Sequence, residues 1–177
     1  MMDTTNRKRS PGVRLTAAER RDAIVDAAVH EFALGGFDAT PAAVIALRAG
    51  VSQPYLFALF GTKRNLFTAA VKRGFGRVRG AILRAAEEHG ESGDALNGVR
   101  AALHSLRQER TLLLLQLQAF AACADLDVRG VTRAEFEKTS RAMASASRAP
   151  GTLSRSLLAE QAMLCVAAAM DLPETWA

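Results

Sequence analysis

The chain has 177 residues, 49% of them hydrophobic, and a mean hydropathy of +0.04. This length suits one domain or two small ones and allows a real core, which excludes wholesale disorder. The longest apolar runs, Leu112–Leu115 and Val166–Met170, are shorter than the ~18 residues that a membrane helix needs. Two cysteines, Cys123 and Cys165, are too few for a disulfide framework and fit a reducing compartment. We therefore expect a cytoplasmic protein without a membrane segment.

Charge is divided unevenly along the chain. Residues 1–80 contain 13 Lys and Arg against 6 Asp and Glu, whereas residues 81–177 contain 10 against 12. A basic first half is where a polyanion such as nucleic acid would bind. Charge alone leaves a second interpretation equally open, namely a solvated basic surface without a partner.

The composition predicts an all-α fold. Alanine and arginine are abundant, β-branched residues are sparse, and no segment alternates cleanly between apolar and polar residues. The first segment, residues 1–15, is a basic arm with Arg7, Lys8, Arg9 and Arg14 and no apolar signal core after it. This arm either contacts DNA or is a disordered solubilising tail.

The spacing predicts a helix from Thr16 to Gly35–Gly36. Thr16 and Glu19 have the spacing of a capping box, and an apolar stripe at four-residue intervals follows. Two short helices come next. Thr40 is expected to cap the first, with Pro41 at its first helical position, and Ser52 to cap the second, which ends near Phe60.

A longer helix is expected from Lys63 towards Glu88, capped by Thr62. The second half predicts one or two helical segments over Ala95–Ala124, broken near Glu109, and then a linker at Asp125–Asp127. Two further helices complete the chain, at about Val128–Ser147 and Leu153–Met170. Pro150–Gly151 separates them.

The segment of about Pro41–Phe60 is a helix-turn-helix candidate, because two short helices flank a turn at Gly50. Leu56 and Phe60 share one side of the second helix, which leaves the opposite side free to enter a major groove. Gln53 is the best candidate for base recognition, since its amide can pair bidentately with adenine. Ser52, Lys63 and Arg64 suit phosphate oxygens.

The segment Ala23–Leu66 resembles the DNA-binding head of the tetracycline-repressor (TetR) family of bacterial regulators. More than a dozen positions match at fixed spacing: Ile24, Ala27, Ala28, Phe32, Gly36, Phe37, Thr40, Ile45, Ala46, Ala49, Gly50, Val51, Ser52, Leu56, Phe60, Lys63 and Leu66. The rest of the chain is similar only in size and helical character, together with a final helix rich in Leu, Ala and Met.

The resemblance implies a homodimeric regulator that binds a palindromic operator and is released by a small molecule bound in the C-terminal body. Carried over by position, Gln53, Pro54 and Tyr55 would face bases, and Thr40, Ser52, Phe57, Ala58, Lys63 and Arg64 would contact phosphate or the groove wall. Phe57 departs from the family's usual Tyr and removes a phosphate hydrogen bond worth about 0.5–1.5 kcal/mol. Specificity would then depend on Gln53, on DNA shape and on the basic arm.

These inferences divide the chain into the arm at 1–15, a DNA-binding domain at 16–66, and a ligand-binding and dimerisation domain at 67–177. Leu115, Phe120 and Met163 are candidate ligand contacts, although such residues are more often core. His30, His89 and His104 lie singly, so no metal or cofactor is expected. The two cysteines are expected to be buried hydrophobes; a thiol sensor is the less favoured alternative.

Two function classes remain besides a ligand-responsive repressor. One is an interaction protein that binds DNA weakly and whose body serves a protein partner without a small-molecule inducer. The other is an enzyme, which the absence of phosphate-loop, dinucleotide and zinc-protease motifs disfavours. The sequence thus predicts a DNA-binding regulator and not an enzyme.

Overall fold

The structure is a computed structural model that describes residues 16–90, 94–148 and 151–173. The basic arm predicted at residues 1–15 lies outside the described residues. The described residues form helices and no strand, which confirms the all-α prediction. The helices are α1 (Ala17–Ala39), α2 (Ala42–Arg48), α3 (Gln53–Phe60), α4 (Lys63–Gly90), α5 (Ala95–Leu106), α6 (Arg110–Ala121), the 3₁₀ turn η1 (Ala122–Ala124), α7 (Leu126–Ser147) and α8 (Gly151–Met170).

The capping box predicted at the start of α1 is present. The Thr16 hydroxyl accepts from the Glu19 N–H at 3.2 Å, and the Glu19 carboxylate accepts from the Thr16 N–H at 2.7 Å. The break predicted at Gly35–Gly36 is present, because Gly36 has a non-helical φ of 72° and ψ of −178°. A short second helical piece follows this kink and takes α1 on to Ala39.

The boundary predicted between α1 and α2 is corrected. Thr40 does not cap α2: it is buried, and its hydroxyl donates to the Glu31 carbonyl at 3.3 Å. Pro41 is the N-cap instead of the first helical residue. The α3 boundaries are confirmed, with the Ser52 hydroxyl accepting from the Tyr55 N–H at 3.3 Å.

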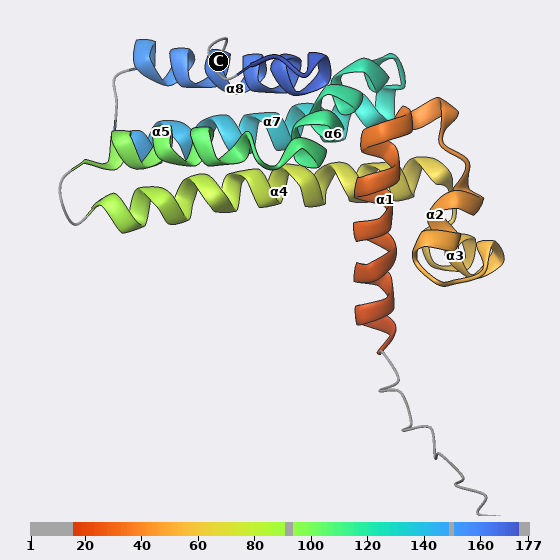
Figure 1. Ribbon diagram of the computed structural model, residues 1–177. Helices are drawn as coiled ribbons and strands as arrows, with labels where there is room; N and C mark the ends of the chain where they lie inside the picture. The colour runs from red at the N-terminus through yellow and green to blue at the C-terminus, as the bar shows by residue number, and fades with distance from the viewer. Residues whose placement is uncertain (1–15, 91–93, 149–150, 174–177) are drawn as a thin grey trace, which may run out of the picture.

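The long helix α4 connects the N-terminal helices to the rest of the molecule. Its apolar stripe (Phe67, Val71, Phe75, Val78 and Ile82) is fully buried. Figure 1 shows α1 crossing α4 at a steep angle, with α2 and α3 on the same side of α4 as the N-terminal half of α1. Phe32 of α1 and Phe67 of α4 meet edge to face, with ring centroids 4.9 Å apart.

The C-terminal helices stack on α4 in layers, with α5, α6 and α7 above it and α8 outermost (Figure 1). The break predicted near Glu109 lies between α5 and α6. The linker predicted at Asp125–Asp127 is wrong. Asp125 is the N-cap of α7, and its carboxylate accepts from the N–H groups of Asp127 and Val128 at 3.0 and 3.1 Å.

Two parts of the described chain pass a test of length and composition for a membrane span, which is weak evidence for one. By length and composition α8 is long and apolar enough, and the bent pair α2–α3 passes the same test if it is counted as one span. The prediction considered uninterrupted apolar runs, whereas α8 carries few charges over 20 residues. A helix of a protein core passes the same test, and Leu157, Leu164 and Cys165 of α8 are buried.

Candidate DNA-binding site

The helix-turn-helix is held by a small apolar core. Ile45 and Ala46 of α2 and Leu56 and Phe60 of α3 are buried. The chain bends by 103° between the two helices, within the range of helix-turn-helix motifs. Gly50 makes this turn possible, since its φ is 65°.

The outward side of α3 carries the residues predicted to face bases. Gln53 and Pro54, in its first turn, and Ala58 are exposed, while Tyr55 and Phe57 are half-buried. No residue of α3 is charged. Gln53 is therefore an exposed, uncharged polar group at the end of the helix that would approach base edges.

The residues predicted to contact phosphate have different surroundings. Ser52 is exposed at the N-cap of α3, but Thr40 is buried. Lys63 donates to the Asp38 carbonyl at 2.8 Å and lies 5.6 Å from the centre of the Phe37 ring. Arg64 pairs with Asp125 at 2.7 Å and with Asp127 at 3.4 Å. In this structure Lys63 and Arg64 thus already have protein partners.

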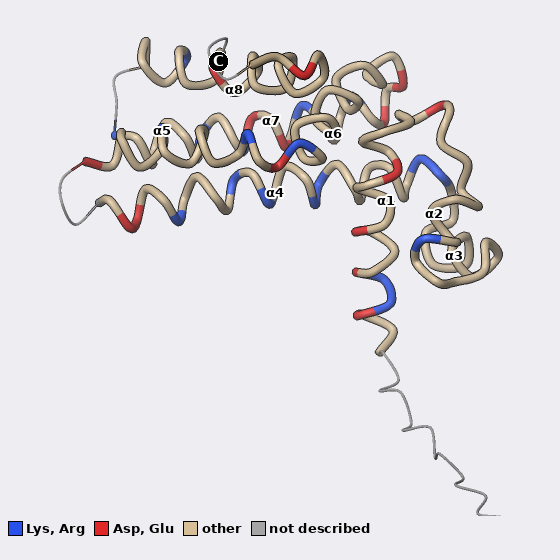
Figure 2. The backbone as a smooth tube through the Cα atoms, in the orientation of Figure 1, with Lys and Arg blue, Asp and Glu red and all other residues tan. Residues whose placement is uncertain are grey.

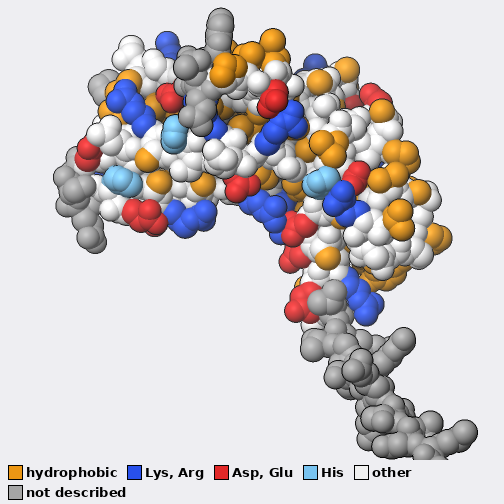
Figure 3. Space-filling model, viewed as in Figure 1, with side chains coloured by type: hydrophobic (Ala, Val, Ile, Leu, Met, Phe, Trp, Pro, Cys, Tyr) orange, Lys and Arg blue, Asp and Glu red, His pale blue; other side chains and the backbone are white. Residues whose placement is uncertain are grey.

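Among the described residues, the Lys and Arg side chains of the first half lie mainly along α4. Figure 2 shows Lys and Arg recurring along α4, and the single cation of α2, Arg48, pairs with Glu31. Arg73 pairs with Asp22 and Asp26, and Arg77 with Asp26 at 2.8 Å. In Figure 3, basic and acidic side chains gather in the corner where α1 meets α4, whereas the α2–α3 end shows separate orange apolar side chains among uncharged ones.

Sequence analysis did not identify the groove in this corner. Its cations include Arg21 and four residues of α4: Lys72, Arg73, Arg77 and Arg84. The four-residue spacing from Lys72 through Gly76 and Gly80 to Arg84 places these residues on one helix face. That spacing was visible in the sequence, but only the structure shows that α1 closes the other side of the groove.

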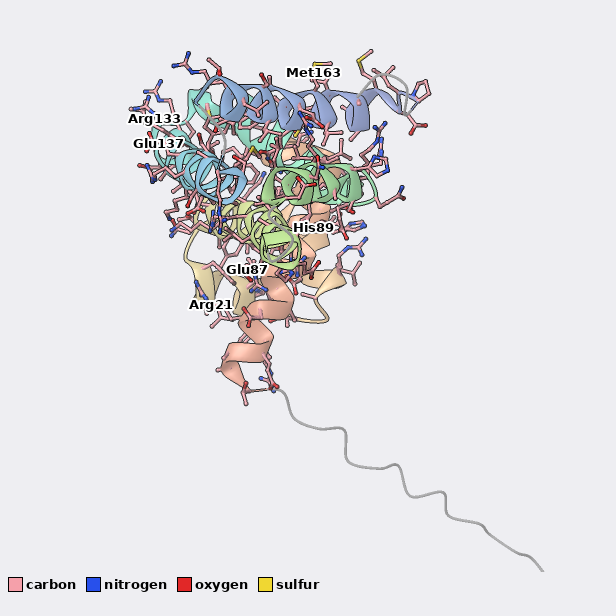
Figure 4. The ribbon with its side chains drawn as sticks, turned by 90° about the vertical axis from the view of Figure 1, so that its left-hand side faces the viewer. Arg21, Glu87, His89, Arg133, Glu137 and Met163 are labelled. Atoms are coloured by element: carbon pink, nitrogen blue, oxygen red, sulfur yellow. The ribbon has the colours of Figure 1, made fainter. Side chains whose placement is uncertain are left out.

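The three candidate ligand contacts lie apart. Leu115 is buried with a methyl group against Gly74 of α4, and Phe120 lies between Phe75 and Phe136, with ring centroids 6.1 and 6.2 Å away. Met163 projects from the outer side of α8 and is 45% exposed (Figure 4). The structure does not bring them together around one cavity.

The cysteines differ in environment. Burial raises the pKa of the Cys165 thiol to about 12, so this residue stays a neutral thiol. The half-buried Cys123 thiol donates to the Ala119 carbonyl at 3.2 Å. Within the described residues no three His, Cys, Asp or Glu side chains come together as metal ligands would.

Comparison with known proteins identifies the N-terminal segment. Residues 24–70 match the family described as bacterial regulatory proteins, tetR family. This segment of the chain is thus similar to the N-terminal part of TetR-family regulators. The match spans most of α1, all of α2 and α3, and the start of α4, so it includes the whole helix-turn-helix described above. Members of this family are DNA-binding regulators and not enzymes.

Solved structures of TetR-like proteins share the fold over most of the chain. A TetR-like regulator from Rhodococcus sp. RHA1 is 25% identical with a TM-score of 0.64, over 91% of this chain and 90% of that one. A putative TetR-family regulator from Mesorhizobium loti is 22% identical with a TM-score of 0.65, over 88% and 78%. A regulator from Aquifex aeolicus is 18% identical with a TM-score of 0.54, over 83% and 78%. A search of curated proteins finds no match.

Proposed function

We propose that this protein is a TetR-family regulator, namely a cytoplasmic transcriptional repressor that binds a palindromic operator as a homodimer. The observation that carries the proposal is the first turn of α3, where the exposed Gln53 follows the Ser52 cap in a helix-turn-helix. In this proposal residues 16–66 bind DNA, with Gln53, Pro54 and Tyr55 facing bases. Residues 67–177 bind the partner subunit and the effector.

The homodimer is supported by the outer side of α8. Small and apolar residues are exposed there at helical spacing: Ala159, Ala162, Met163, Val166, Ala169 and Met170. Phe136 on the neighbouring α7 is 39% exposed. Two copies of α7 and α8 packed about a two-fold axis would bury these side chains in a four-helix interface. Two-fold symmetry of the protein would match the symmetry of a palindrome.

Release by a small molecule is supported by a buried amide pair between α6 and α8. Gln116 is 1% exposed and Gln161 is 4% exposed, and the Gln161 Nε2 donates to the Gln116 Oε1 at 2.7 Å. The Gln116 Nε2 and the Gln161 Oε1 have no hydrogen-bond partner among the described residues. Exchanging N and O in both amides again leaves one donor and one acceptor unpaired.

An unpaired buried polar group costs about 1–3 kcal/mol. A ligand with an apolar body and a neighbouring carbonyl and N–H would satisfy both amides. We infer a mainly hydrophobic effector that carries one amide-like group. Leu115, Phe120 and Met163 lie apart from one another. Each therefore stays a candidate contact only for a part of the ligand that extends to that residue.

The test of the proposed function is selection of bound duplexes from random DNA, followed by titration of the selected duplex and a scrambled duplex at one salt concentration. The expected outcome is an inverted repeat and a preference of at least about 10³-fold for it. Binding without sequence preference would contradict the proposal.

A second candidate function is an interaction protein that binds DNA only weakly. It is favoured by the exposed apolar side chains of α2, since Leu47 is 81% exposed and Val44 is 40% exposed. An apolar surface on a DNA-binding head suits a protein partner better than a phosphate backbone. Weak, unselective DNA binding together with no response to any small molecule would favour this alternative.

A further inference from the structure

A groove of about 580 Å³ lies between the N-terminal half of α1 and the middle of α4. Its cations are Arg21, Lys72, Arg73, Arg77 and Arg84, and its one acidic lining residue is Asp22. Figure 3 shows this corner as a hollow between the two helices, and Figure 4 places Arg21 on α1 below α4. The groove is therefore an open, mainly positive surface.

Acidic side chains at the groove neutralise part of its positive charge. Asp26 pairs with Arg77 at 2.8 Å and with Arg73 at 3.3 Å, and Asp22 pairs with Arg73. Five cations face these two carboxylates, so a positive excess remains. Lys72 and Arg84 are both exposed on α4. Positive charge that is not neutralised by ion pairs within the protein is available to an anionic partner.

Arg21 connects the groove to the recognition helix. Its guanidinium lies 4.3 Å from the centre of the Phe60 ring and donates to the Leu59 carbonyl at 3.1 Å. Both residues are in the last turn of α3. Arg21 thus belongs both to the groove lining and to the contact between α1 and α3.

Two glycines lie between the cations of α4 without a packing role in the described chain. Glycine destabilises a helix interior relative to alanine. A glycine inside a helix is therefore expected to have a packing or binding role. Gly74 has one, because a Cβ there would lie 2.7 Å from the Leu115 side chain. At Gly76 and Gly80 a Cβ would meet only Arg79 and Arg84 of α4 itself, at 3.8 and 3.1 Å. Their absent side chains leave the helix backbone open to close approach by a ligand.

We propose that this groove binds the phosphate backbone of the same duplex that α3 reads. The inference rests on the proposed function. Phosphate contacts are needed from outside α3, because α3 carries no charge. Lys63 and Arg64, at the start of α4, already have partners within the protein. Most protein–DNA affinity comes from phosphate contacts. Cations on α1 and α4, on the same side of α4 as α2 and α3 (Figure 1), supply these contacts.

The experiment compares the full chain with two double variants that lose the same charge. Lys72→Gln with Arg84→Gln neutralises the groove, and Arg100→Gln with Arg110→Gln neutralises exposed cations of α5 and α6. Each protein is titrated with the selected duplex and a scrambled duplex at several salt concentrations. The groove variant should bind both duplexes about tenfold more weakly, with an unchanged specificity ratio. The slope of the logarithm of the binding constant against the logarithm of the salt concentration should be shallower by about 1.8 per protomer. This is about 0.9 for each of the two lost phosphate contacts.

A second pair of variants tests the close approach. Gly76→Leu should weaken binding to both duplexes, while Gly130→Leu, at an α7 glycine whose Cβ would meet nothing within 4 Å, should not. Equal salt slopes for the groove variant and the wild type, or equal losses in the α5/α6 control, would overturn the inference. The proposed function would survive that result if the wild type still selects an operator; it fails if the wild type has no sequence preference.

A small phosphate compound could occupy the same cationic groove in place of a DNA backbone. Melting in inorganic phosphate is compared with melting in chloride at equal ionic strength. We expect equal melting temperatures, because an open groove suits a long polyanion. Stabilisation by phosphate that Lys72→Gln with Arg84→Gln abolishes would assign the groove to a small anion and overturn its assignment to DNA.

Discussion

The Arg64 Nε donates to the Asp125 Oδ2 at 2.7 Å, which joins two residues 61 positions apart in the chain. Arg64 is in the first turn of α4, directly after the helix-turn-helix, and Asp125 caps α7. Hydrogen bonds from the Val128 N–H and from Arg64 lower the pKa of Asp125, which keeps the carboxylate charged. This ion pair is a direct polar contact between the DNA-binding end of the molecule and a helix of the proposed dimer interface.

The first prediction concerns this pair. Asp125→Ser keeps a side chain that caps a helix but removes the charge. The free energy of unfolding should change by less than about 1 kcal/mol, since Ser and Asp cap helices similarly. Arg64 becomes free for phosphate, so the salt slope of DNA binding should steepen by about 0.9 per protomer. Titration at several salt concentrations checks this, with Asp127→Ser, whose contact to Arg64 is the longer at 3.4 Å, as the control.

The second prediction concerns base recognition. Gln53→Ala should cost about 1–3 kcal/mol on the operator and relax the preference at one base pair per half-site. Lys63→Ala should weaken operator and scrambled DNA alike, because a phosphate contact carries no sequence information. Competition between the two duplexes at fixed salt measures both effects. An unchanged specificity ratio in Gln53→Ala would transfer base recognition to Tyr55 or to the N-terminal arm.

The third prediction concerns assembly. The wild type should sediment as a dimer at micromolar concentration, and Val166→Glu should shift it towards monomer by placing a charge in the proposed interface. Leu83→Glu changes an equally exposed apolar residue of α4 and should leave the dimer intact; Val166 is 37% and Leu83 38% exposed. A wild type that is monomeric at this concentration would contradict the dimer.

The fourth prediction concerns the buried amides. Gln116→Met with Gln161→Met removes both partners of the pair, so the free protein should be as stable as the wild type or more stable. The same variant should lose stabilisation by amide ligands. Benzamide is the probe, and methyl benzoate, which has no N–H donor, is its control. Equal shifts in melting temperature by both compounds, or equal benzamide shifts in wild type and variant, would contradict the proposed role of the amides.

The fifth prediction concerns Glu135, which is buried on α7. Burial by itself would raise the pKa of this carboxyl, but hydrogen bonds from Lys138 at 2.6 Å and Arg79 at 3.1 Å more than offset it and lower the pKa. A carboxyl with a lowered pKa in the folded state stabilises the protein above its unfolded pKa of about 4.3, and this stabilisation is lost as pH falls through the folded value.

The free energy of unfolding should therefore be about 1–3 kcal/mol lower for Glu135→Gln than for the wild type at pH 7. The difference should shrink as pH falls below about 4. Urea titrations between these pH values measure it. Glu137→Gln is the control, since Glu137 is more than half exposed and lies 3.7 Å from Arg141. A pH-independent difference would show that the charge of Glu135 is not the cause.

Local signals predicted most of the fold. The Thr16–Glu19 capping box, the Ser52 cap and the apolar stripe of α4 depend on residues three or four positions apart, and sequence spacing reports such contacts directly. Asp125 was assigned to a linker because a polar residue between apolar helices suits a loop as well as a cap. Only the backbone course after it shows that α7 begins at once.

The long-range contacts at the candidate site could not be predicted in this way. Lys63 and Arg64 have the expected positions, but their partners, Asp38 and Asp125, lie 25 and 61 residues away. Leu115 and Met163 are both apolar and helical, yet one faces α4 and the other projects from α8. Periodicity shows which residues share a face of one helix, but not which helix that face meets.

The apolar core continues without interruption from α1 through α4 into α6 and α8, so Phe32, Leu66, Phe67 and Leu115 belong to one cluster. The boundary that we propose between residues 66 and 67 separates the DNA-binding part from the ligand-binding and dimerisation part. It does not separate two hydrophobic cores. The N-terminal helices have no separate core about which to fold, and the described chain should unfold in one cooperative transition. A DNA-binding head could be exchanged between such regulators only together with the surfaces of α4 and α6 that α1 covers.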